Sequence, residues 1–365
     1  MKIKAAVTWG ANEGFKMEEV DLAEPNANEV LIEVLATGVC HTDAAAAGGH
    51  MGVPFPMVFG HEASGIVKKI GASVTKFTPG DAVVVACCKC DHCDPCLTGE
   101  PGSCENIPVL NFGGAMEDGT KRISKDGKEI STFFGQSTFA THAITNEKNL
   151  VKVENNEYLE LYGPFGCGIA TGSATVLECL KPKFASTIAV YGCGGVGLSA
   201  VMAAKIAGCA KIIAVDINDE RLQLAKELGA THIINSKDSD TVEKVREFTD
   251  GHGVNYGVEC SGKGFIAKQA LAALGKSGEL ALIGAGYEPT EIDLNSEFLF
   301  GTKKLVGYIA GKVSSQYFVP KLIEYHKMGK FPFEKMVKFY DFNDIEQAFA
   351  DSASGKTIKP ILRIK

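Results

Sequence analysis

Residues 187–206 contain the feature that most restricts the fold of this chain: a strand-like segment, a glycine turn and a helix-like segment in direct succession. TIAVY is a short apolar run rich in β-branched residues, as expected of a buried strand, and LSAVMAAKI has the character of a buried helix. The residues between them, 192–197, form the pattern G-x-G-x-x-G, in which glycine lets the backbone turn sharply. This succession is the building unit of a parallel sheet with helices on its faces.

The same alternation continues along the chain. KIIAVDI, NYGVECSG and GELALIGAG are strand-like, and DERLQLAKELGA is an amphipathic helix that ends at Gly229. We therefore expect an α/β fold with a doubly wound parallel sheet after about residue 168. The first 150 residues show short alternating runs broken by proline and glycine, which predict a β-rich region. Pattern alone leaves open where the terminal strand KPILRIK pairs.

Length, charge and hydropathy exclude several classes of protein. A chain of 365 residues exceeds what one hydrophobic core usually holds, so we expect two domains. The net charge of −7, without a basic run, argues against nucleic acid and against an anionic membrane surface as partners. No apolar stretch reaches transmembrane length, and MKIKAAVTWG lacks the apolar segment of an export signal. The expected location is cytoplasmic.

Four cysteines with the spacing C-x2-C-x2-C-x7-C lie close together: Cys90, Cys93, Cys96 and Cys104. One short loop can supply the four thiolates that a structural Zn²⁺ takes in a closed tetrahedral site. The alternative is two disulfide bonds, but thiols stay reduced in the expected compartment, which favours the metal. Any catalytic metal must then use other ligands.

The glycine turn predicts a dinucleotide site, because it follows a strand and opens a helix. Its backbone can approach a pyrophosphate, and the helix N-terminus offers unpaired N–H groups. Asp216 ends the next strand, where a carboxylate accepts from both adenosine ribose hydroxyls and repels a 2′-phosphate, so NAD is favoured over NADP. Arg221 is a cation that can serve either cofactor. The turn positions assigned to the cofactor are Gly192, Gly194, Gly195, Val196 and Gly197.

A catalytic zinc needs three protein ligands and one open position. Cys40, His61 and Cys167 are candidates, because each lies beside a glycine at an expected turn. They are far apart in the sequence, and taken singly each is more often a buried filler than a metal ligand. Spacing therefore leaves this second site open.

GHEASGIVKKIGASV, from Gly60 to Val74, matches the pattern G-H-E-x-x-G-x5-G-x-x-V. It resembles the zinc signature of the medium-chain alcohol dehydrogenases. GVCHTD, the four-cysteine loop, GCGIATG and the glycine turn follow in that family's order and extend the resemblance over essentially the whole chain. Within the family, GVCHTD, FFGQSTFATHA and YGPFGCGIATG are most similar to the bacterial aryl-alcohol (benzyl alcohol) dehydrogenases.

The resemblance implies a GroES-like β-rich catalytic domain, residues 1–168 and 309–365, split around a Rossmann NAD-binding domain, residues 169–308. It implies two zinc ions per chain, one structural in the four-cysteine loop and one catalytic. Asp43 would orient the ligand histidine. The residues implied at the catalytic zinc are Cys40, His61, Glu62 and Cys167.

The resemblance also implies a proton relay that begins at Thr42. The family usually ends this relay at a histidine where this chain has Ala45, so water or His41 would complete it. His41 has a second interpretation as a pyrophosphate contact, which we favour, and Lys359 matches another cation near the pyrophosphate. The remaining positions assigned to the cofactor are Thr171 and Ile283.

By family position, Met51, Phe133 and Phe134 would line the substrate pocket, and Ala86 replaces a bulkier residue. The alternative for the two phenylalanines is simple core packing. We expect reversible oxidation of an aryl or allylic primary alcohol, such as benzyl alcohol, to the aldehyde with NAD. The alternatives are an aliphatic or terpenoid alcohol and a thiol-adduct alcohol of the formaldehyde dehydrogenase type.

Two other classes share this architecture: non-catalytic NAD-binding scaffold proteins and zinc-free quinone or enone reductases. Neither requires the residues of both zinc sites, so zinc content would discriminate them. The resemblance further implies a homodimer or homotetramer, formed through the edge strand at residues 303–311.

Overall fold

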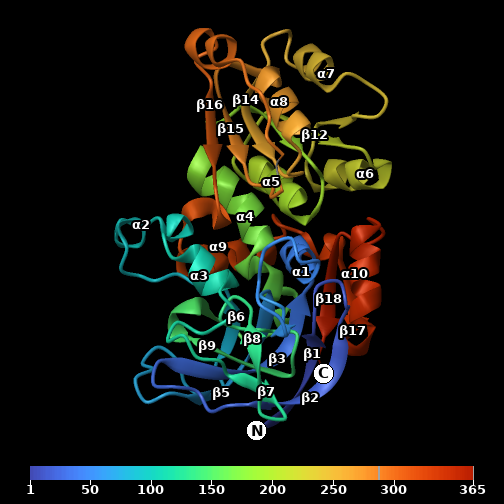
Figure 1. Ribbon diagram of the computed structural model, residues 1–365. Coiled ribbons are helices and arrows are strands. Elements are labelled where there is room, and N and C mark those ends of the chain that lie inside the picture. Colours follow the sequence, from blue (N-terminus) through green and yellow to red (C-terminus); the bar gives the residue numbers. More distant parts are fainter. Residues whose placement is uncertain (287, 365) are drawn as a thin grey trace. The chain divides into compact units, whose positions relative to one another are not determined.

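The computed structural model describes residues 1–286 and 288–364, which form two compact units (Figure 1). The first unit comprises Met1–Cys167, Ser314–Ile323 and Phe333–Lys365, and the second comprises Gly168–Val313 and Glu324–Pro332. The predicted α/β fold is confirmed. The predicted domain limits, at residues 168 and 309, stay a prediction.

The second unit is built on a six-stranded parallel sheet with the strand order β13-β12-β11-β14-β15-β16. Numbered along the chain, this order is 3-2-1-4-5-6, that of a Rossmann fold. The central strands are almost entirely buried, which explains their continuous apolar sequences. The strands are β11 (Thr187–Tyr191), β12 (Lys211–Asp216), β13 (His232–Asn235), β14 (Val254–Glu259), β15 (Leu274–Leu282) and β16 (Lys304–Gly307).

Helices connect these strands, and polar residues begin two of them. The Asn218 side chain accepts from the backbone N–H of Arg221, and Asp240 accepts from that of Glu243, which caps α6 and α7. Gly229 ends α6 with φ of +135°, a conformation that glycine adopts without steric cost. The helices are α4 (Gly168–Ala174), α5 (Gly195–Ile206), α6 (Asp219–Leu228), α7 (Thr241–Phe248) and α8 (Gly264–Ala273).

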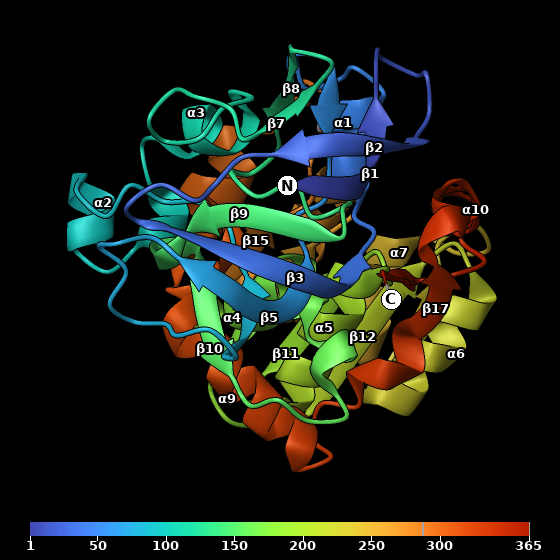
Figure 2. The same ribbon diagram turned by 90° about the horizontal axis from the view of Figure 1, so that it is seen from below.

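The first unit contains a closed barrel, β1-β2-β7-β8-β4, and a seven-stranded sheet, β10-β6-β5-β3-β18-β17, with β9 paired to β3. In Figure 2 the paired strands β1 and β2, and the paired strands β3 and β9, face the viewer. The strands of the barrel are β1 (Lys2–Thr8), β2 (Lys16–Leu22), β4 (Met57–Val58), β7 (Ile123–Lys125) and β8 (Lys128–Thr132). Those of the sheet are β3 (Glu29–Gly38), β5 (Ala63–Ile70), β6 (Ala82–Val85), β9 (His142–Asn146), β10 (Leu150–Val153), β17 (Val337–Asp341) and β18 (Lys359–Arg363).

The terminal strand predicted from KPILRIK is β18, and it lies between β3 and β17. It therefore belongs to the β-rich unit, although residues 168–358 lie between Cys167 and Lys359 in the chain.

Among the described residues, no helix is both long enough and apolar enough to cross a membrane. The remaining helices are α1 (His41–Ala47), α2 (Asp94–Leu97), α3 (Ile107–Phe112), α9 (Ser315–Lys327) and α10 (Ile345–Ala353).

Candidate active site

Three distant segments of the first unit bring together the side chains of Cys40, His61, Glu62 and Cys167. Each offers one ligand atom, and these atoms all lie within 4.8 Å of one another. Cys40 is the residue before α1, the His61–Glu62 pair lies between β4 and β5, and Cys167 follows the 3₁₀ turn Gly163–Gly166. The structure thus brings together the candidate ligands of the second metal site, which their spacing in the sequence could not identify.

The buried carboxylate of Asp43 connects two of these segments. Its oxygens accept from the backbone N–H of Cys40, at 3.2 Å, and from that of Gly60, at 3.0 Å. Oδ1 also accepts from His61 Nδ1 at 3.0 Å, and all of Asp43 is shielded from solvent. Because Nδ1 is engaged by the carboxylate, Nε2, which faces Cys167, is the ring nitrogen available to a metal.

Glycine is needed where these segments approach their neighbours. Gly60 has φ of +93°, and a Cβ there would collide with the backbone N of Phe139. A Cβ at Gly166 would collide with the carbonyl oxygen of Val85. These contacts explain why glycine precedes both His61 and Cys167 in the sequence.

The donor atoms of this group suit zinc. His61 Nε2 and Cys167 Sγ are 3.2 Å apart. In a tetrahedral zinc site, the nitrogen of an imidazole ligand and the sulfur of a thiolate ligand lie about 3.5 Å from each other, so this separation is close to what zinc requires. A hydrogen bond with Cys167 lowers the pKa of the Cys40 thiol well below its ordinary value, although burial opposes the shift. The same bond raises the pKa of Cys167. A bound divalent cation would let both sulfurs become thiolates.

Glu62 forms an ion pair with Lys359, the first residue of β18, and both side chains are buried. The ammonium also donates to the carbonyl of Val39 at 3.0 Å. Burial raises the pKa of Glu62 to about 7, and the charge of Lys359 partly offsets this increase. The structure therefore places Lys359 beside the cysteine and histidine group, and its expected contact with a pyrophosphate stays a prediction.

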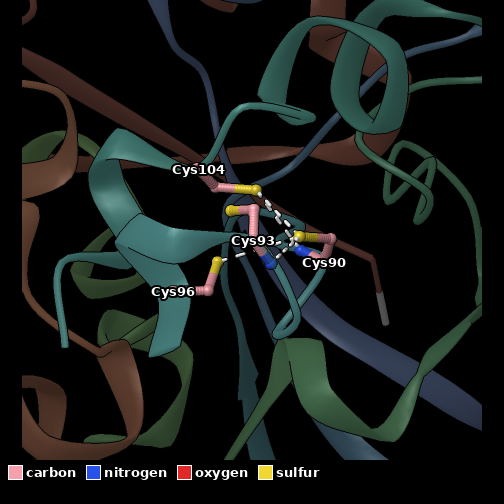
Figure 3. A group of neighbouring side chains, drawn as sticks. All are labelled: Cys90, Cys93, Cys96 and Cys104. Carbon is pink, nitrogen blue, oxygen red and sulfur yellow. Dashed lines mark hydrogen bonds between the residues drawn. The ribbon is translucent and has the colours of Figure 1, made fainter. Parts of the chain in front are cut away.

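The four-cysteine loop forms the second such group (Figure 3). The sulfur of Cys90 lies 3.6 Å from that of Cys104 and 4.0 Å from that of Cys96. The distance between two thiolate sulfurs that bind the same tetrahedral zinc is about 3.8 Å, which lies between these two values. The backbone N–H of Cys93 also donates to Cys90 Sγ at 3.3 Å. All twelve cysteines of the chain are free thiols, so the disulfide alternative is absent from the structure.

The glycine turn lies at the carboxyl ends of the parallel strands in the second unit. Gly192 has φ of +91°, and a Cβ at Gly197 would collide with the carbonyl oxygen of Gly192. Gly194 is the N-cap of α5, which begins at Gly195, and no atom lies within 4 Å of a Cβ built at Gly194. The open side of this turn therefore leaves room for a phosphate at the helix N-terminus.

Asp216 ends β12 beside this turn and is 8% exposed. Its carboxylate accepts from the backbone N–H of Cys193 at 2.6 Å and from those of Ile217 and Asn218 at 2.8 and 3.0 Å. Nε of Arg221 is buried and has no hydrogen-bond partner among the described residues. An unpaired donor and a carboxylate with remaining acceptor capacity suit the hydroxyls of a ribose.

The other predicted positions have varied surroundings. His41 is exposed at the start of α1, and Thr42 is half-buried, with Oγ1 accepting from the Cys40 thiol at 3.6 Å. Thr171, on α4, and Ile283, directly after β15, belong to the second unit and are half-buried. Their contacts with a cofactor stay predictions.

The predicted pocket residues lie in or beside the core of the first unit. Phe133 is fully buried and Phe134 is 6% exposed, whereas Met51 is half-buried and packs against that core. Phe134 stacks on the imidazole of His61, a contact that sequence reasoning missed because it depends on an unusual backbone conformation.

Two family models match the chain. The model described as "Alcohol dehydrogenase GroES-like domain" matches residues 26–155, and the model described as "Zinc-binding dehydrogenase" matches residues 195–325. The geraniol dehydrogenase of Castellaniella defragrans is 36% identical over 367 residues, which cover 98% of this chain and 97% of that protein.

Two solved structures are similar over their whole length, each 43% identical. One is an alcohol dehydrogenase zinc-binding domain protein from Burkholderia ambifaria, with a TM-score of 0.97 and coverage of 100% of this chain and 99% of that one. The other is the benzyl alcohol dehydrogenase of Acinetobacter calcoaceticus, with a TM-score of 0.96 and full coverage of both chains.

Proposed function

The chain belongs to the family of zinc-binding alcohol dehydrogenases, and we propose that it oxidises an aryl or allylic primary alcohol reversibly to the aldehyde with NAD. The observation that carries this proposal is the convergence of Cys40, His61, Glu62 and Cys167 in one group. Two thiols and an imidazole are the donor set of a catalytic zinc that keeps one position open. The proposal includes a second, structural zinc in the four-cysteine loop.

Zinc supplies Lewis-acid stabilisation of the negative charge that develops on an alcohol oxygen. Cys40, His61 and Cys167 would hold the ion, and Asp43, which accepts from Nδ1 of His61, would keep the imidazole oriented toward it. The hydroxyl of Thr42, which lies beside Cys40, accepts the proton of the alcohol and passes it onward. Because Ala45 cannot take part in proton transfer, the proton leaves through His41 or water.

NAD would accept the hydride, held by the second unit at the glycine turn. Asp216 and Arg221 would bind the adenosine ribose, and the carboxylate would disfavour a 2′-phosphate. Of the two candidate cations for the pyrophosphate, Lys359 already pairs with Glu62, whereas His41 is exposed. This difference favours His41 as the phosphate contact.

The substrate class draws support from the relatives. Geraniol and benzyl alcohol, the compounds in the names of two of them, are an allylic and an aryl primary alcohol. In both compounds the carbon that loses hydride adjoins a π-system. Met51 and Phe134 would provide an apolar wall for such a substrate, whereas Phe133 is fully buried and would support Phe134 from behind. Ala86 would leave room for a ring. A terpenoid alcohol fits the same argument.

We also propose that the protein is a cytoplasmic homodimer or homotetramer. The strand β16 lies at the edge of the six-stranded sheet, so its outer backbone groups can pair with those of a second copy.

A panel of alcohols and aldehydes tests the proposal, with NAD and NADP assayed in parallel by absorbance of the reduced cofactor. Benzyl alcohol and geraniol should give a higher kcat/KM than ethanol, and NAD a higher one than NADP. Zinc analysis should find two ions per chain, and one after replacement of His61 by Ala. Two zinc ions per chain without turnover of any of these alcohols would show that the proposed substrate class is wrong, and a single zinc ion per chain in the wild type would contradict the catalytic site.

A further inference from the structure

The ring of Phe134 lies almost flat against the imidazole of His61. The ring centroids are 4.3 Å apart and the planes differ by 20°, whereas Phe133 meets the same imidazole edge-on at 5.7 Å. Asp43 holds Nδ1 of His61 in the plane of the ring, and Phe134 covers one of its faces. Together these contacts restrict both the rotation and the tilt of the imidazole.

Phe134 makes this contact from a backbone conformation that L-residues rarely adopt. Its φ is +53°, in the left-handed region, and such a residue persists only where its surroundings fix it. Two hydrogen bonds do so: the N–H of Phe134 donates to the carbonyl of Asn111 at 2.9 Å, and the Cys88 thiol donates to the carbonyl of Phe134 at 2.7 Å. A Cβ on Gly135 would lie 2.9 Å from Cys88 Sγ, so the turn packs tightly on this thiol.

Cys88 and Asn111 flank the four-cysteine loop on either side. Cys88 precedes Cys90 by two residues, and Asn111 lies on α3, which follows Cys104. The two are joined directly: the N–H of Cys88 donates to Asn111 Oδ1 at 3.0 Å, and Asn111 Nδ2 donates to the carbonyl of Cys88 at 3.1 Å. Phe112, also on α3, packs edge-on against Phe134 with centroids 5.3 Å apart.

We propose that Phe134 is a positioning residue for His61, and that the four-cysteine loop holds Phe134 in place through Cys88 and Asn111. The proposal rests on the proposed function, because it takes His61 as a metal ligand. Closure of the loop around a metal keeps its flanking residues, Cys88 and Asn111, together. Those residues fix the left-handed turn, and the turn presses the ring of Phe134 on the imidazole. The loop therefore supports the geometry of the other metal group.

Cobalt provides a readout that does not depend on turnover. Co²⁺ bound by two thiolates and an imidazole absorbs visible light differently from Co²⁺ bound by four thiolates, and the bands report ligand geometry. In Phe134→Leu, which keeps an apolar side chain but removes the aromatic face, the bands of the His61 site should shift. Release of its cobalt to a chelator should accelerate about tenfold or more. Phe77→Leu, in a buried phenylalanine of the same core, should leave both unchanged.

Cys88 gives a second test that is independent of the Phe134 side chain. Cys88→Ala removes the donor to the Phe134 carbonyl and should accelerate cobalt release from the His61 site, whereas Cys88→Ser keeps a donor and should restore most of the wild-type rate. If both Phe134→Leu and Cys88→Ala release cobalt from the His61 site at the wild-type rate, the positioning role of Phe134 is overturned and the proposed function is unaffected. A wild-type protein that takes cobalt only in the four-cysteine loop would overturn the proposed function together with it.

Discussion

The ammonium of Lys359 and the carboxylate of Glu62 pair in the interior of the first unit, with side chains 7% and 0% exposed. Lys359 begins β18 and Glu62 precedes β5, so the pair joins segments from opposite ends of the chain. A buried charge without its partner is strongly unfavourable, whereas loss of both charges together is often tolerated.

Replacing Lys359 by Met should lower the free energy of unfolding of the first unit by about 3–5 kcal/mol, because the buried carboxylate of Glu62 would lose the positive charge beside it or would have to take up a proton. Urea denaturation followed by circular dichroism measures this loss. Combining the change with Glu62→Gln should recover most of it, as a double-mutant cycle would show. Equal and additive losses from the two single changes would contradict the pairing.

Replacing Asp43 by Asn should weaken zinc binding at the His61 group about 10–100-fold, since the carboxylate that orients the imidazole would lose its charge. Competition with a chromogenic chelator measures the affinity. Asp21→Asn is the control, because Asp21 is an exposed carboxylate that pairs with Lys2 at 2.9 Å. If both variants bind zinc like the wild type, Asp43 does not orient a metal ligand.

Replacing Asp216 by Ala should raise KM for NAD and reduce the preference for NAD over NADP about tenfold or more, the effect of losing charge-assisted hydrogen bonds to the ribose. The ratio of kcat/KM for the two cofactors is the measurement. Asp219→Ala removes a nearby carboxylate that instead accepts from Asn235 at 2.8 Å, and it should keep the wild-type ratio. An unaltered ratio in Asp216→Ala would remove Asp216 from the cofactor site.

Asp351 should contribute stability that depends on pH. A hydrogen bond from Tyr340 at 2.7 Å lowers the pKa of Asp351 below its ordinary value, and contacts with Lys356 and Gln347 add to this against the opposing effect of burial. An acid with a lowered folded-state pKa stabilises the fold above its unfolded pKa of about 3.9, and this contribution is lost as the pH falls further.

Asp351→Asn should therefore unfold at a lower temperature than the wild type at pH 7, and the difference should shrink below about pH 4. Thermal unfolding across this range measures the difference. Asp126→Asn, in an exposed turn, should differ little from the wild type throughout. A difference for Asp351→Asn that stays constant down to about pH 3 would show that its charge is not responsible.

Local sequence patterns were sufficient to predict the parallel sheet of the second unit. TIAVY and KIIAVDI became β11 and β12, and the glycine turn between strand and helix lies where its spacing predicted. The four cysteines of the loop also converge as predicted, because short stretches of chain join them and leave little conformational freedom between them. Their binding of zinc stays a prediction.

Long-range contacts were beyond such patterns. Cys40, His61 and Cys167 are brought together by the pairing of distant strands, and only the family resemblance grouped them in advance. The ion pair of Glu62 with Lys359 depends on β18 lying beside β3. The contact between Phe134 and His61 depends on a left-handed residue other than glycine, which propensity does not predict.

The position of β18 has a consequence for the order of events during translation. The second unit is nearly continuous in the chain, so it can begin to fold as it leaves the ribosome. The seven-stranded sheet cannot be completed at that stage, because β18, which lies between β3 and β17, is synthesised only after that unit. Until then only Ala36–Gly38 of β3 lack their partner strand, since β9 already pairs with Glu29–Glu33 on the same side, and this short unpaired edge stays open to contacts with other chains.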